Sequence, residues 1–150
     1  MNSRPLILGC GNPDRSDDAA GLLVARRLRQ LGIDAHEHGG EMLSLIEAWR
    51  GAADVILIDA IASGARPGTI KVWNARNSPL PLEPFRCSTH AFGVAEAVEL
   101  ARALDRLPCR LTIYGIEATK FESGGSPSSA VADGVERLAQ DIAGALRTPQ

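Results

Sequence analysis

Val55-Ile56-Leu57-Ile58-Asp59 reads as a buried β-strand that stops at a carboxylate. Its four consecutive apolar residues, three of them β-branched, are typical of a strand that is covered on both faces. A second apolar run, 6–8, stops at Gly9-Cys10-Gly11-Asn12-Pro13, which predicts another buried strand that ends in a tight loop. Two such strands near the start of a chain indicate a fold built around a central parallel sheet.

Extended and helical patterns alternate along the rest of the chain. They predict further strands at 33–38, 69–73 and 111–116, helices at 20–31, 42–49 and 91–107, and a last helix that begins near 126. This alternation favours the α/β class: a three-layer α/β/α sandwich with a mainly parallel, twisted sheet of about five strands and helices on both faces. We expect residues 1–150 to form a single domain of this kind.

Capping residues predict where two of the helices begin. Ser16 or Asp17 is placed to cap the first helix, and acidic residues in its first turn complement the helix dipole. Ser126 is placed to cap the last helix, with Pro127 at its first helical position.

Composition excludes several classes of protein. The net charge is −2 and the arginines are scattered among acids, whereas proteins that bind nucleic acid usually carry a basic surface. No apolar run approaches the length of a membrane span, so we expect no membrane partner. Cys10, Cys87 and Cys109 form no CxxC pair and no even disulfide set, which favours a reducing cytoplasm.

Four residues that could bind a metal or act in catalysis follow the predicted strands or precede a helix. Asp17 and Asp18 follow the first strand, Asp59 ends the strand at 55–58, and His90 precedes the helix at 91–107. Ligands of parallel α/β folds bind beyond the carboxyl ends of the strands, so these side chains are expected to share one crevice. Carboxylates and an imidazole can hold a divalent ion with positions left open, as metal-assisted hydrolysis requires.

Each of these residues also has a structural alternative. Asp17 and Asp18 can stabilise a helix start, and a carboxylate such as Asp59 can bond only to loop amides. His36 and His38 are interpreted as strand or surface residues. The residue pattern by itself leaves both interpretations open.

Several motifs, in order and at matching spacing, resemble those of the hydrogenase maturation proteases. The first is a glycine-asparagine turn followed by an acidic pair and a helix glycine. The others are a paired glycine, a strand-Asp-Ala segment with a later Pro-Gly-Thr, a Ser-x-His loop before a helix, and a late strand with its exit. In this chain they are Gly9–Asn12 with Asp17-Asp18 and Gly21, Gly39-Gly40, 55–60 with 67–69, Ser88–Gly93, and Tyr114–Glu117.

The resemblance implies an endopeptidase that removes a short C-terminal tail from the precursor of a hydrogenase large subunit. Its catalytic and nickel-recognising residues map onto Asp18, Asp59 and His90, and its substrate-binding residues onto Gly39, Gly40 and Asn12. The nickel is expected to arrive with the precursor rather than to belong permanently to the enzyme.

This chain departs from the family pattern near the double glycine. His38 and Glu41 stand where Asp and Thr are frequent, and Asp18 stands where some members carry Glu. Because the double-glycine loop is associated with substrate recognition, the identity of the precursor is less constrained than the fold.

Four other functions are alternatives. A non-catalytic chaperone for a nickel protein would use the same ligands without turnover. A peptidyl-tRNA hydrolase shares the turn Gly9–Pro13, but needs a histidine in the next loop, where Asp17-Asp18 stands. A dinucleotide-binding module would need glycine in place of Asp14, and a serine hydrolase would need a GxSxG motif that the chain lacks.

Overall fold

The computed structural model describes residues 4–12, 16–85, 93–119 and 126–147. His90, the third member of the predicted site, and Cys87 lie outside these described residues.

A five-stranded sheet forms the centre of the molecule, as predicted. Its strands have the order β2-β1-β3-β5-β4, and all neighbours are parallel except β4, which runs antiparallel to β5 on one edge. The strands are β1 (Leu6–Cys10), β2 (His36–His38), β3 (Asp54–Ile61), β4 (Ile70–Asn74) and β5 (Arg110–Glu117).

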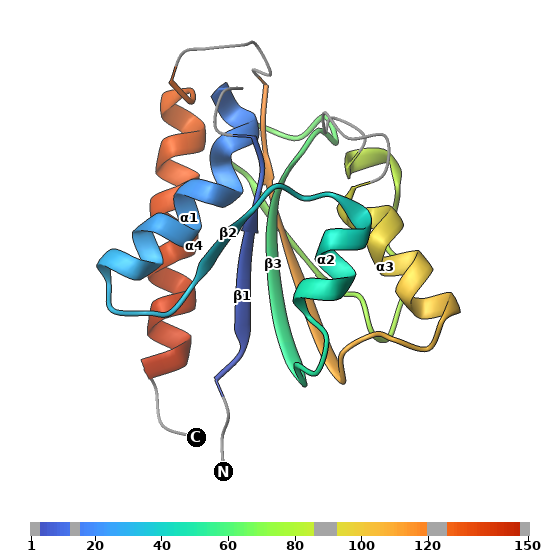
Figure 1. Ribbon diagram of the computed structural model, residues 1–150. Coiled ribbons are helices and arrows are strands. Elements are labelled where there is room, and N and C mark those ends of the chain that lie inside the picture. The colour runs from blue at the N-terminus through green and yellow to red at the C-terminus, as the bar shows by residue number, and fades with distance from the viewer. Residues whose placement is uncertain (1–3, 13–15, 86–92, 120–125, 148–150) are drawn as a thin grey trace.

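Helices cover both faces of this sheet and complete the three-layer sandwich (Figure 1). Figure 1 shows α1 and α4 side by side on one face, and α2 and α3 on the other. The helices are α1 (Ala20–Gln30), α2 (Met42–Ala48), α3 (Val94–Ala103) and α4 (Ser129–Arg147), with short 3-10 helices η1 (Ser16–Ala19) and η2 (Glu83–Phe85). Within the described ranges, none of the helices has the length and apolar character needed to cross a membrane.

Alternation along β3 divides the core between the two helical layers. Ile58 and Ala60 pack in the cluster under α1 and α4, whereas Leu57 and Ile61 pack in the cluster under α2 and α3. Successive side chains of a strand point to opposite faces, so Asp59 lies on the α2 and α3 side. A strand covered by helices on both faces explains why its sequence is a continuous apolar run.

Two predicted boundaries differ from the structure in ways that bear on the site. The strand at 55–58 does not end at Asp59, because β3 continues beside β5 through Ile61. The last helix begins at Ser129, so the predicted cap Ser126 and the helical position of Pro127 are wrong. Its start is displaced because the amide and hydroxyl of Ser128 donate to the carboxylate of Asp17, which holds the chain outside the helix up to that residue.

The helix predicted at 91–107 is shorter than expected at its C-terminal end. It ends at Ala103, and Asp105 takes a left-handed conformation with φ of 57°. The Arg106 N–H then donates to the carbonyl of Ala101, which satisfies a carbonyl of the last helical turn.

Candidate active site

The strands β1 and β3 separate at the point where Asp59 stands. The last β1–β3 pair joins Gly9 and Ile58, and β3 then continues beside β5 with Asp59 opposite Gly115. β1 ends at Cys10 and is followed by a loop, in which the Asn12 N–H donates to the carbonyl of Asp18. The carboxyl ends of β1 and β3 thus form the kind of edge at which α/β folds bind ligands.

A close backbone contact places η1 over these strand ends. A Cβ added to Gly9 would lie 2.1 Å from the carbonyl oxygen of Gly21. One added to Gly21 would lie 2.2 Å from the carbonyl oxygen of Cys10 and 2.4 Å from that of Ile58. Only glycine allows α1 to approach the sheet this closely. The approach brings the preceding residues Ser16–Ala19, all of them buried, onto the end of the sheet.

Asp59 is a buried carboxylate with little compensation. Its side chain is 6% exposed, and its Oδ1 accepts a hydrogen bond from the adjacent Ala60 N–H (2.9 Å). Within the described part of the chain no other amide, hydroxyl or cationic side chain donates to this carboxylate. Burial, and next the negative charge of Asp18, raise the pKa of Asp59 well above its ordinary value of 3.8. The predicted pair Asp18 and Asp59 is therefore brought together.

Cys10 completes the described part of this site. Its thiol is fully buried, and burial together with the charge of Asp59 raises its pKa well above the ordinary value. A thiol held in its neutral form is a poor nucleophile. Cys10 therefore contributes a buried, neutral side chain next to Asp59.

Asp18 and Asp59, both buried at the end of the sheet, favour the binding of a cation or a proton. The charge of Asp18 adds to burial in disfavouring the ionised form of Asp59. The pair can therefore attract a cation that arrives from outside, or carry a proton at a pH where ordinary aspartates have lost theirs. In the described residues no group of three His, Cys, Asp or Glu side chains is arranged to hold a metal ion, so a third ligand depends on His90, which is not described.

Asp17 has a structural role that differs from that of its neighbour. It was predicted either to cap the first helix or to join the site, but Ala19 occupies the N-cap position of α1 and no side chain caps that helix. The Asp17 carboxylate instead accepts hydrogen bonds from the N–H of Ser128 (2.7 Å) and of Thr119 (3.0 Å), and from both hydroxyls. It ties η1 to the exit of β5 and the start of α4.

We predict that Asp17→Ala lowers the free energy of unfolding by about 3–5 kcal/mol, because the part-buried amides and the hydroxyls of Thr119 and Ser128 would all lose their charged acceptor. Asp133→Ala, on the exposed surface of α4, is the matched control and should stay within about 0.5 kcal/mol of the wild type. Urea unfolding of the three proteins measures the difference. Equal unfolding free energies for the two variants would contradict the structural role of Asp17.

Glu117 is a buried carboxylate whose role was not predicted from the sequence. It ends β5 and accepts hydrogen bonds from the amide and hydroxyl of Ser63 and from the amide of Gly64. Its backbone N–H donates to the carbonyl of Thr69. Glu117 therefore fixes the β3–β4 loop at the edge of the site, and its only sequence signal was its place at the end of the Tyr114–Glu117 motif.

The residues predicted to bind substrate lie around this edge. Gly40 is buried, has φ of +87°, and an added Cβ there would lie 3.7 Å from the Cβ of Cys10. Its N–H donates to Nδ1 of His38, whose carbonyl accepts from the Gly11 N–H. Gly39 is exposed and Asn12 half-buried. The structure thus brings Gly40 against Cys10 and links its loop to the loop that carries Asn12.

Comparison with known proteins agrees with this architecture. Residues 25–145 match the family described as hydrogenase maturation protease, HycI. The [NiFe] hydrogenase maturation protease HybD from Thermococcus kodakarensis is 30% identical, with a TM-score of 0.72 over 97% of this chain and 100% of that chain. The hydrogenase maturating endopeptidase HybD from E. coli, at 23% identity, has the same fold, with a TM-score of 0.76 over 97% of this chain and 93% of that chain.

The chain also matches a longer relative, of which it covers a smaller share. The hydrogenase expression/formation protein HupD from Rhodobacter capsulatus is 26% identical over 139 residues, which cover 89% of this chain and 66% of that protein. The chain thus spans about two thirds of the length of this relative. The match over residues 25–145 and the likeness to the Thermococcus protease together show that the chain belongs to the hydrogenase maturation protease family.

Proposed function

We propose that this protein is an endopeptidase that removes the C-terminal tail of a nickel-loaded hydrogenase large-subunit precursor. The observation that carries the proposal is Asp59: a buried carboxylate of β3, just past the last residue paired with β1, whose pKa is raised by burial and by Asp18 and whose described surroundings supply no cation. Family membership supports the substrate class. It also removes the peptidyl-tRNA hydrolase and dinucleotide-binding alternatives, which depended on the first loop alone.

The nickel in this proposal is part of the substrate. Asp18 and Asp59 would offer oxygen ligands and His90 a nitrogen ligand, a mixed set that suits a borderline divalent ion. A precursor that carries nickel would bring a positive charge to the two carboxylates, whereas a metal-free precursor would not. Recognition of the metal would therefore make cleavage depend on completed nickel insertion.

Hydrolysis needs a group that takes a proton from water. Asp59 would take this proton as the ionised carboxylate, and its raised pKa belongs to the metal-free state before the nickel-loaded precursor binds. Water would attack the scissile carbonyl as its proton passes to Asp59, and the departing amine would then receive that proton. Gly40 lies beside Cys10 in this part of the site, where an added Cβ would be 3.7 Å from the Cβ of Cys10.

Incubation with precursor tests the activity. We expect this protein to shorten a nickel-loaded large-subunit precursor and to leave the nickel-free precursor intact, which mass spectrometry of the products would measure. A stable complex with the loaded precursor but no cleavage, across a panel of large subunits, would favour the chaperone alternative.

A metal titration tests the ligand set without a partner. We predict that nickel or cadmium binds near one equivalent, and that Asp18→Ala, Asp59→Ala and His90→Ala each weaken binding by about a hundredfold, because each removes a ligand. Asp54→Ala is the matched control, since Asp54 begins the same strand at its other end. If calorimetry gives the same metal affinity for all three ligand variants as for the wild type, the proposed ligand set is wrong.

We also propose a cytoplasmic location. Cys10 and Cys109 are free thiols, and Cys109 is exposed, as a reducing compartment permits.

A further inference from the structure

Two exposed leucines lie at the same edge of the sheet as Asp59. Leu43, in the first turn of α2, is 61% exposed, and Leu82, just before η2, is 38% exposed. Leu104, which is 53% exposed, lies at the opposite edge, between the end of α3 and the start of β5. Single exposed apolar side chains are common on protein surfaces, so it is the position of Leu43 and Leu82 at this edge that distinguishes them from Leu104.

The packing of α2 does not require Leu43. The inward stripe of this helix consists of Met42, Leu45 and Ile46, with Trp49 one turn further, and these residues pack in the core cluster beneath α2 and α3. Leu43 lies outside that stripe and contributes little to the core. An apolar residue at this position is therefore available for a contact outside the chain.

The first turn of α2 is held firmly next to the double glycine. Both oxygens of Glu41 accept hydrogen bonds from this turn: from the Leu43 N–H (3.1 Å), the Ser44 N–H (2.9 Å) and the Ser44 hydroxyl (2.9 Å). Glu41 follows Gly40, which lies against Cys10 and so beside Asp59. Leu43 is thereby held three residues after Gly40, which lies beside Cys10 in the candidate active site.

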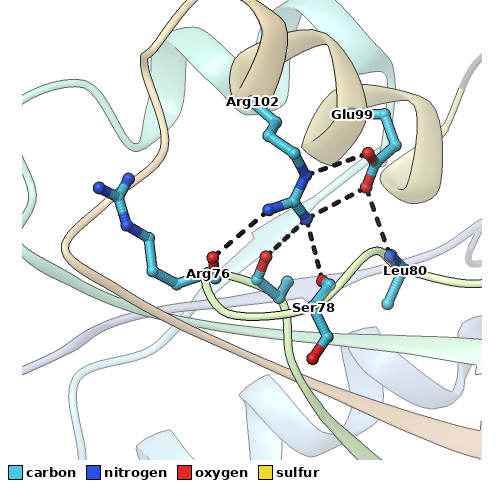
Figure 2. Close-up of polar contacts among 6 residues, drawn as sticks. Arg76, Ser78, Leu80, Glu99 and Arg102 are labelled. Carbon is cyan, nitrogen blue, oxygen red and sulfur yellow. Dashed lines mark hydrogen bonds and ion pairs between the residues drawn. The ribbon is translucent and has the colours of Figure 1, made fainter.

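Leu82 is held in place by a separate set of contacts. Figure 2 shows the guanidinium of Arg102 donating to the carbonyls of Ala75, Arg76 and Ser78 and to the carboxylate of Glu99, which in turn accepts from the Leu80 N–H. The Ala62 N–H donates to the carbonyl of Pro84, which fastens the far end of this connection next to the end of β3. The segment with Leu82 is thus anchored on both sides.

We propose that Leu43 and Leu82 are specificity-determining contacts that bind apolar side chains on the precursor beside its cleavage site. This proposal rests on the proposed function. The precursor is the binding partner, because the two leucines lie at the edge of the site that must receive it. Selection of one peptide bond in a large protein needs binding energy from groups remote from that bond. Burial of one leucine side chain corresponds to about a tenfold to hundredfold change in a binding constant.

The test compares Leu43→Gln and Leu82→Gln with Leu104→Gln. Glutamine keeps the length and much of the helix propensity of leucine, so the folded chain should be retained, which thermal unfolding verifies. We expect the first two variants to raise the KM for the precursor about tenfold or more with kcat within about twofold, and the third to match the wild type. A KM unchanged in both rim variants, or raised equally in Leu104→Gln, would overturn the proposal.

Two further outcomes are distinguishable. If the wild type forms dimers in sedimentation and Leu43→Gln is monomeric, a second copy occupies the rim and the proposal is wrong. If the wild type cleaves no precursor, the proposed function fails, and direct titration of precursor then decides the rim inference. Binding weakened about tenfold by Leu43→Gln but not by Leu104→Gln would support it, and equal binding would overturn it.

Discussion

Asp59→Asn is expected to lower precursor cleavage by about a thousandfold or more and, at the same time, to make the folded chain more stable. The loss follows because an amide cannot take a proton from water, and removal of a general base typically costs about two to four orders of magnitude. The gain follows because the substitution removes a buried charge next to Asp18 and keeps the oxygen that accepts from the Ala60 N–H. A structural carboxylate would show the opposite change in stability.

The gain in stability should depend on pH with a definite sign. The pKa of Asp59 is raised in the folded chain, so the neutral form is the one that folding favours. Its contribution is fully present below the ordinary value of 3.8 and is lost as the pH rises through the raised folded value. Asp59→Asn should therefore remove part of the decline in unfolding free energy that begins as the pH rises above 3.8, by about 1 kcal/mol or more.

Urea unfolding at a series of pH values measures this effect, with Asp54→Asn at the other end of β3 as the control. An Asp59→Asn protein less stable than the wild type at neutral pH would mean that the carboxylate is structural. Full cleavage activity in the same variant would remove Asp59 from the mechanism.

The parts of the fold that could be predicted from sequence are those with a local signal. The apolar run at 55–58 and the alternation of strands and helices predicted the sheet and its layers, because burial on both faces leaves a pattern in consecutive residues. Helix ends were less accurate. The start of α4 depends on Ser128 donating to Asp17, which is 111 residues earlier in the chain, and no local pattern reports such a contact.

The site shows the same limit. Asp17 and Asp18 are adjacent in sequence and identical in type, so the residue pattern alone did not separate them, and only the family resemblance assigned the site role to Asp18. The structure separates them because a 3-10 turn directs Asp17 toward Thr119 and Ser128, and the charge of Asp18 acts on Asp59. Glu117 was missed as a site-edge residue because its partners, Ser63 and Gly64, lie more than fifty residues earlier. The role of His90 stays a prediction.

Gly21→Ala is expected to be strongly damaging, with a loss of about 4 kcal/mol or more in unfolding free energy. The new Cβ would meet the carbonyl oxygens of Cys10 at 2.2 Å and Ile58 at 2.4 Å. Both are backbone atoms of the central strands, so neither can rotate away as a side chain would, and overpacking a rigid site typically costs about 1–3 kcal/mol even where side chains can adjust.

Gly144→Ala is a stringent control for this prediction, because the same substitution in α4 meets nothing within 4 Å and should stabilise the helix by about 0.5–1 kcal/mol. Thermal and urea unfolding of the two variants should therefore move in opposite directions from the wild type. If Gly21→Ala is tolerated, α1 does not rest on the strands as closely as the structure indicates. Asp18 would then lose the backbone contact that places it beside Asp59, so the stability of this one variant tests the architecture on which the proposed active site depends.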